Sequence, residues 1–116
     1  MRDRESLASA VTERLYQEKP SLLEKHGEYG RTKCLQDMRY NIEHLLPAVE
    51  LDDVSLFSRY VLWLDDLLRA RNVDTDDVVR CLTILRDECT ARYGDDGAFI
   101  ARIIDGGMSD LQRGEA

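Results

Sequence analysis

One short segment of the chain combines a thiol, two cations and a carboxylate at helical spacing. It covers residues 30–40 and reads GRTKCLQDMRY. On a helix, residues three apart share a face, so Arg31, Cys34 and Asp37 are expected to line up. Arg31 and Lys33 favour a thiolate at Cys34, and a carboxylate can accept two N–H donors at once. The segment therefore suits a ligand that carries both N–H groups and acidic arms.

The same spacing also has a purely structural interpretation. Cys34 could be a half-buried apolar residue, Arg31 and Asp37 an exposed ion pair, and Lys33 a solvated charge. A single cysteine flanked by charges does not define a site. Spacing alone leaves both interpretations open.

Length and composition predict one globular domain over residues 1–116, with residues 1–3 and 112–116 loose. The chain is 43% hydrophobic and 34% charged, a balance that lets a packed core form. Its net charge of −7 would repel a phosphate backbone, so we expect no nucleic-acid partner.

Neither a signal peptide nor a membrane segment is expected. The N-terminal residues alternate in charge where a signal peptide needs an apolar core, and no apolar run of membrane-spanning length occurs. We therefore predict a cytoplasmic protein without membrane contacts. The three cysteines form no C-x-x-C pair, which argues against a disulfide framework or a structural zinc site.

Apolar residues recur at three- and four-residue steps along the whole chain, which predicts an all-α fold. Five segments of unequal length suit a globin-like packing of crossed helices better than an up-down bundle. A loop is expected at 27–30 and a break at 106–107, because glycines gather there. In the first half of the chain we expect a helix over residues 4–18, a short helical turn at 21–24 and a long helix that starts at 31 and bends or ends near 47. In the second half we expect a helix that follows the capping acids 52–53 and runs to 68, a helix from about 75 to 89, and a last helix around 99–104.

The two remaining thiols fall on an apolar stripe. Cys81 and Cys89 lie at helical steps from Val78 and Leu82. We predict that both are ordinary core residues. The helix that contains residues 56–68 carries two apolar stripes and is expected to be central.

The 30–40 segment resembles the chromophore-binding helix of the phycobiliproteins, particularly that of their α-type subunits. In that helix a basic residue and a Lys-Cys pair precede an Asp that lies three residues after the Cys. The similarity extends back over residues 11–20, through Val11, Tyr16 and Pro20, and forward through Tyr60, Leu67 and residues 72–82, so it covers most of the chain at low identity. The positions that match in the segment are Gly30, Arg31, Lys33, Cys34, Asp37 and Tyr40.

This resemblance implies a globin-like fold and a linear tetrapyrrole, that is, a bilin such as phycocyanobilin or biliverdin. Cys34 would bond to the vinyl or ethylidene carbon, and Asp37 would accept hydrogen bonds from the inner pyrrole nitrogens. Arg31 and Lys33 are the candidates for the propionates. Tyr60 would contribute to the pocket from the facing helix.

The chain also departs from the antenna pattern. Gln36 stands where antenna subunits carry an Arg, and Asp77-Val78 stand where α-type subunits have Trp-Tyr. The extra N-terminal helical pair through which antenna subunits assemble is absent from this sequence. These departures argue against a light-harvesting subunit and favour a non-enzymatic bilin carrier or a bilin-biosynthesis-associated globin, with biosynthetic enzymes as partners and a homodimer as the assembly.

Two alternatives stay open. A haem-binding globin would share the fold, but the helix with residues 57–68 has no His to ligate iron. His26 is expected in a loop and His44 at a polar border, and both are interpreted as surface residues. A ligand-free, dimerising interaction module would pair copies through the apolar helix that contains Trp63.

An enzyme is not expected. The chain does not combine a nucleophile, a His and a carboxylate at the spacing of a catalytic triad. It also shows no phosphate-binding loop and no metal-ligand cluster. Its paired acids fall at helix caps or on outer faces, where they are solvated charges.

Overall fold

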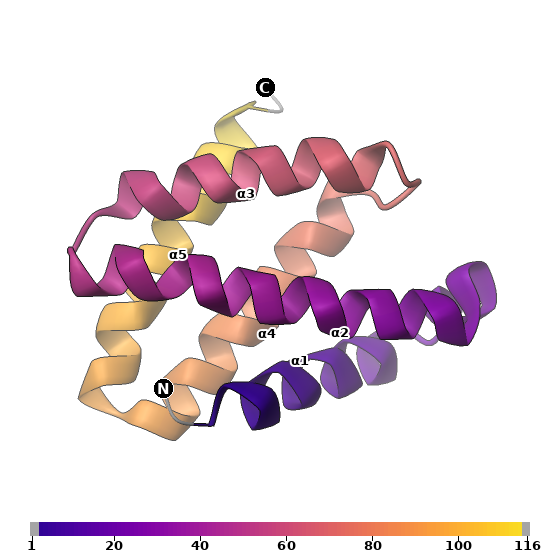
Figure 1. Ribbon diagram of the computed structural model, residues 1–116, viewed down its shortest axis with the longest axis horizontal. Coiled ribbons are helices and arrows are strands. Elements are labelled where there is room, and N and C mark those ends of the chain that lie inside the picture. Colours follow the sequence, from indigo (N-terminus) through magenta and orange to yellow (C-terminus); the bar gives the residue numbers. More distant parts are fainter. Residues whose placement is uncertain (1–2, 115–116) are drawn as a thin grey trace.

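The computed structural model describes residues 3–114 and contains five helices in that range (Figure 1). No strand occurs among the described residues, so the all-α prediction is confirmed. The helices are α1 (Arg4–Glu18), α2 (Ser21–Glu50), α3 (Val54–Arg69), α4 (Thr75–Tyr93) and α5 (Asp95–Gly114).

The helices form two crossed layers. Figure 1 shows α1, α2 and α3 across one face, while α4 and α5 cross behind them. Helix α5 packs against α3 and α4, and α1 packs against α2 and α4. Helices that cross at large angles around one core are characteristic of globin-like folds rather than up-down bundles.

The apolar stripe and the C-terminal end of α1, and the start of α3, agree with the local signals in the sequence. The buried residues of α1 include Leu7, Val11 and Leu15, which form the predicted stripe, and the helix stops shortly before Pro20. Asp53 caps α3, because its Oδ1 accepts a hydrogen bond from the Ser55 backbone N–H at 3.0 Å.

Helix α2 is longer than predicted at both ends. The predicted loop at 27–30 is a break at one residue, Gly27, whose φ of 69° and ψ of −172° interrupt the helical geometry. Gly30 already lies in the helix that follows. Pro47 does not end α2 either, since the helix continues to Glu50.

The predicted break at Gly106–Gly107 is wrong, because α5 continues without interruption to Gly114. Both glycines lie where α5 passes close to α3. A Cβ at Gly106 would collide with Val54, and one at Gly107 would lie 2.9 Å from a ring carbon of Phe57. These glycines therefore allow close packing instead of ending the helix.

The predicted loose N-terminal segment is partly anchored, since Tyr93 donates a hydrogen bond to Asp3 at 2.6 Å. The rest of the predicted loose ends, residues 1–2 and 115–116, lies outside the described residues.

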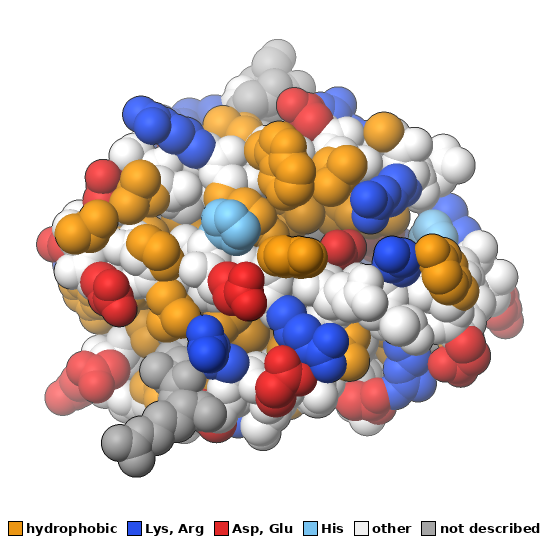
Figure 2. Space-filling model, viewed as in Figure 1, with side chains coloured by type: hydrophobic (Ala, Val, Ile, Leu, Met, Phe, Trp, Pro, Cys, Tyr) orange, Lys and Arg blue, Asp and Glu red, His pale blue; other side chains and the backbone are white. Residues whose placement is uncertain are grey.

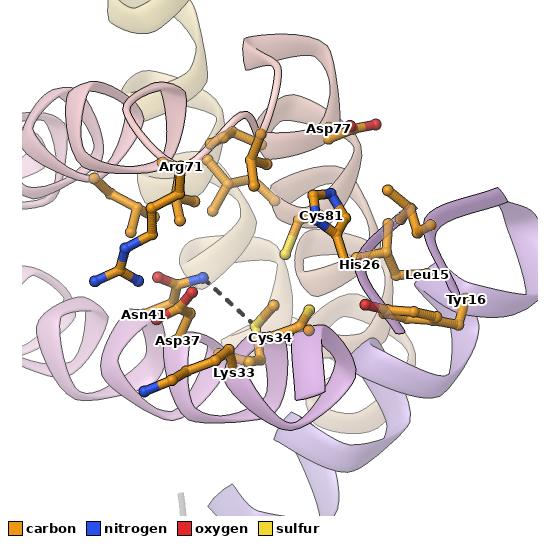
Figure 3. Close-up of a pocket in the computed structure, with 18 of the residues that line it drawn as sticks. Leu15, Tyr16, His26, Lys33, Cys34, Asp37, Asn41, Arg71, Asp77 and Cys81 are labelled. Atoms are coloured by element: carbon orange, nitrogen blue, oxygen red, sulfur yellow. Dashed lines mark hydrogen bonds between the residues drawn. The ribbon is translucent and has the colours of Figure 1, made fainter. Parts of the chain in front are cut away.

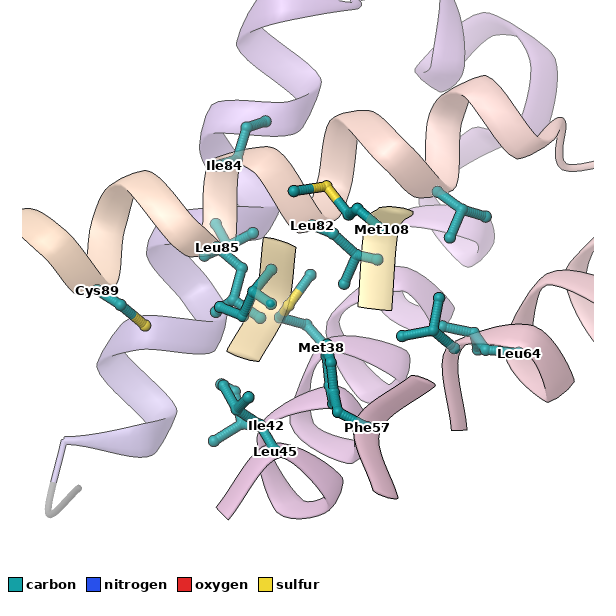
Figure 4. Close-up of a cluster of buried hydrophobic side chains, with 14 of the residues drawn as sticks. Met38, Ile42, Leu45, Phe57, Leu64, Leu82, Ile84, Leu85, Cys89 and Met108 are labelled. Atoms are coloured by element: carbon teal, nitrogen blue, oxygen red, sulfur yellow. The ribbon is translucent and has the colours of Figure 1, made fainter. Parts of the chain in front are cut away.

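The core lies between the two layers and contains apolar side chains from all five helices. Figure 4 shows how α2, α3 and α4 contribute to it. Its largest fully buried side chains include Met38, Ile42, Phe57, Leu82 and Leu85. Dense packing of this kind holds α2 and α4 in fixed positions on either side of the site described below.

Helix α3 is not as central as predicted. Phe57 and Val61 are fully buried, whereas Leu62 is 40% exposed and Trp63 is 57% exposed. The neighbouring helices cover only one side of α3, so Leu62 and Trp63 lie on the surface. Within residues 3–114, no helix is long and apolar enough to cross a lipid bilayer.

Candidate functional site

A cavity of about 490 Å³ lies between α1, α2, α3 and α4 (Figure 3). Its volume is in the range of sites that hold drug-sized ligands. Figure 2 shows a hollow on the face formed by α2 and α3, with Lys and Arg side chains beside it. The polar residues among those that line the cavity include Tyr16, His26, Lys33, Cys34, Asp37, Asn41, Arg71 and Asp77.

Three of the five predicted site residues line this cavity. Lys33, Cys34 and Asp37 all lie on α2. Cys34 and Asp37 are half-buried and one helical turn apart, as their spacing predicts. The thiol and the carboxylate can therefore contact one ligand at the same time.

Arg31 does not line the cavity. Its guanidinium pairs with Glu13 of α1 and lies 5.8 Å from the centre of the Tyr16 ring. Three helical residues turn by about 300°, so a line of residues three apart drifts by about 60° at each step. Over the six residues from Arg31 to Asp37 this drift is large enough to direct Arg31 towards α1.

Tyr60 does not line the cavity either, and it is buried in the core. Its hydroxyl donates a hydrogen bond of 2.5 Å to Oδ1 of Asn41, which does line the cavity. Tyr60 therefore orients a cavity residue instead of contacting a ligand.

Arg71 supplies a cation that the sequence analysis did not identify. It belongs to the connection between α3 and α4, and it lines the cavity. Figure 3 shows Arg71 on the same side of the cavity as Lys33 and Asp37. This arrangement places two cations beside one carboxylate.

The thiol of Cys34 is less acidic than predicted. Burial, and then the charge of Asp37, raise its pKa to about 11, although a hydrogen bond with Thr12 partly opposes them. The expected stabilisation of a thiolate is therefore wrong. Arg31 is paired elsewhere, and Lys33 is exposed. Burial dominates because it removes the water that would solvate the charged form.

The carboxylate of Asp37 is also affected by its surroundings. Burial raises its pKa above the usual value, while the charges of Arg71 and Lys33 act in the opposite direction. A half-buried carboxylate between two cations is a strong acceptor for N–H donors.

Two further residues also line the cavity. His26 is half-buried there, and Cys81 packs against the core, as predicted, while it lines the cavity as well. Cys89 is fully buried, as predicted. His44 is exposed, as predicted, and it stacks on Tyr60 with ring centres 4.1 Å apart.

Together, the crossed helices and the cavity define a globin-like helical domain with a cavity of about 490 Å³ between its helices. A family model described as phycobilisome protein matches residues 2–111, so the chain belongs to the phycobilisome protein family. Members of this family carry linear tetrapyrrole chromophores. No curated protein and no solved structure matches the chain.

Proposed function

We propose that this protein is a non-enzymatic bilin carrier that acts alongside the enzymes of bilin biosynthesis. The observation that supports this function best is one cavity that combines a thiol, a half-buried carboxylate and two cations. Asp37 would accept hydrogen bonds from the inner pyrrole N–H groups, and Lys33 and Arg71 would pair with the propionates. Cys34 is the candidate for covalent attachment.

Reversible binding comes before any covalent bond in this proposal. The Cys34 thiol is neutral at pH 7, because its pKa is raised to about 11. A neutral thiol is a poor nucleophile. A bilin such as biliverdin or phycocyanobilin is therefore held first by Asp37 and the cations, which suits a protein that delivers its pigment.

Haem is a second candidate, and His26 is the observation that favours it. The Nε2 atom of this residue is buried in the cavity wall and could ligate iron. However, the inner nitrogens of haem bind the metal and offer no N–H to Asp37. Asp37 would then accept no hydrogen bond from the pigment, and the charges of Lys33 and Arg71 alone would oppose the effect of its burial. The cavity therefore suits a metal-free bilin better.

Arg71→Ala is expected to weaken the binding of biliverdin about tenfold, because it removes one charge-assisted contact to a propionate. Biliverdin dimethyl ester lacks that negative charge, so the same substitution should change its affinity by less than about twofold. Titration of each pigment, followed by visible absorbance, measures both affinities. Wild-type protein that leaves the biliverdin spectrum unchanged would rule out the proposed function.

The proposed assembly is a homodimer that pairs two copies of α3 through its exposed apolar side. Figure 2 shows hydrophobic side chains gathered on the face that contains this helix. We expect light scattering to give the mass of a dimer for the wild-type protein and that of a monomer for Trp63→Glu. Leu23→Glu, a charge placed at the exposed Leu23 of α2, should leave the dimer intact. A monomeric wild-type protein contradicts this part of the proposal.

A further inference from the structure

The cavity also contains two buried polar atoms that lack a hydrogen-bond partner anywhere in residues 3–114. They are Nε2 of His26 and Oδ2 of Asp77, and both residues line the cavity. Buried polar groups in folded proteins are nearly always hydrogen-bonded. Two such atoms in the wall of one cavity therefore indicate polar groups on the ligand.

The backbone around His26 holds its imidazole against the cavity. Gly27 adopts a positive φ of 69°, which glycine reaches without strain and which produces a kink in α2 directly after His26. Gly30 leaves space for the imidazole, because a Cβ there would collide with the Cβ of His26. This part of α2 is thus shaped around His26.

Asp77, on α4, is held in place by an ion pair with a residue at the end of α1. It lies in the first turn of α4 and is only 5% exposed. Lys19, at the end of α1, contacts Oδ1 of Asp77 at 2.5 Å. This ion pair fixes the carboxylate, while its second oxygen, Oδ2, has no hydrogen-bond partner among the described residues.

We propose that His26 and Asp77 recognise a terminal lactam ring of the bilin, an inference that depends on the proposed function. A lactam ring carries one N–H donor and one C=O acceptor. Asp77 Oδ2 accepts the lactam N–H, and His26 Nε2–H donates to the lactam oxygen. With these two hydrogen bonds, one lactam ring provides a partner for each of the two protein atoms that lack one.

The arrangement of the cavity agrees with this assignment. Figure 3 shows His26 and Asp77 away from Lys33 and Arg71, with Cys34 and Asp37 along the floor. A bilin whose propionates lie at the two cations and whose inner nitrogens lie at Asp37 extends an end ring towards His26. Haem has no lactam ring, so these contacts distinguish the open-chain pigment from the cyclic one.

His26→Leu tests the proposal with three ligands. We expect it to weaken biliverdin and biliverdin dimethyl ester equally, by about tenfold, because both contain the lactam ring. Haem should bind the variant as it binds wild type. The melting temperature of the ligand-free variant should not fall, because the imidazole nitrogen that is removed has no partner among the described residues.

Asp77→Asn is expected to weaken both bilins by a similar factor, and Asp76→Asn is its control. Asp76 lies beside Asp77 in the first turn of α4, but it is exposed and does not line the cavity, so this substitution should alter bilin affinity by less than about threefold. An effect as large as that of Asp77→Asn would mean that the loss does not report a contact between Asp77 and the bilin.

The remaining outcomes are separable. If wild type binds biliverdin and His26→Leu binds it equally well, only the lactam assignment fails. If wild type binds haem with a Soret band that His26→Leu abolishes, and binds no bilin, then both this assignment and the proposed function fail.

Discussion

Covalent attachment of phycocyanobilin to this protein is expected to accelerate about a thousandfold between pH 7 and pH 10. The thiolate is the nucleophile, and below the pKa its fraction rises about tenfold for each pH unit. Burial and the charge of Asp37 raise the pKa of Cys34 to about 11, so this rise continues throughout the interval. The Cys34 sulfur bonds to the ethylidene carbon, and one proton from solvent completes the addition, so no other reactant is needed.

The colour that stays with the chain after denaturation in acidic urea measures this reaction. Cys34→Ala should abolish it, and Cys89→Ala should leave it unchanged, because Cys89 is fully buried on α4 and does not line the cavity. Circular dichroism at each pH confirms that the fold persists. A rate that is constant from pH 7 to pH 10 would contradict the raised pKa. Attachment that persists in Cys34→Ala but is lost in Cys81→Ala would assign the bond to Cys81.

The helices could be predicted well because helical periodicity is a local property. The stripe on α1 and the cap at Asp53 depend on residues only a few positions apart. The glycines were harder to interpret. Gly27 interrupts a helix through its backbone angles, whereas Gly106 and Gly107 allow α5 to approach α3. A sequence shows the glycine in both cases but does not show whether another helix lies beside it.

Part of the site was predictable for the same local reason. Cys34 and Asp37 belong to one turn of one helix, so their common exposure to a ligand follows from spacing. Arg71 and His26 reach the cavity only through the tertiary arrangement, and nothing in their sequence neighbourhoods indicates it. The acidity of Cys34 was predicted in the wrong direction, since the local cations were visible in the sequence and the burial was not.

Asp37→Asn is expected to weaken biliverdin binding about a hundredfold, the largest loss of affinity for any single substitution in the cavity. The carboxylate can accept two charge-assisted hydrogen bonds from pyrrole N–H groups, whereas the amide offers one neutral acceptor and an opposing donor. Fluorescence or absorbance titration against wild type measures this loss. Equal affinity of the two proteins would show that Asp37 does not accept the pyrrole N–H groups.

The same substitution should make the ligand-free protein more stable at neutral pH. Burial raises the pKa of Asp37, so the folded state binds this proton more tightly than the unfolded state does. The stability that this proton contributes is complete below the unfolded pKa, near 4, and is lost as the pH rises through the folded pKa. Asparagine has no charge to bury, so urea unfolding should show a more stable variant at pH 7 and a smaller difference at pH 4. Glu43→Gln, at an exposed position of the same helix, should change neither affinity nor stability. A gain in stability together with a loss of affinity would identify Asp37 as a residue suited to the ligand and not to the fold.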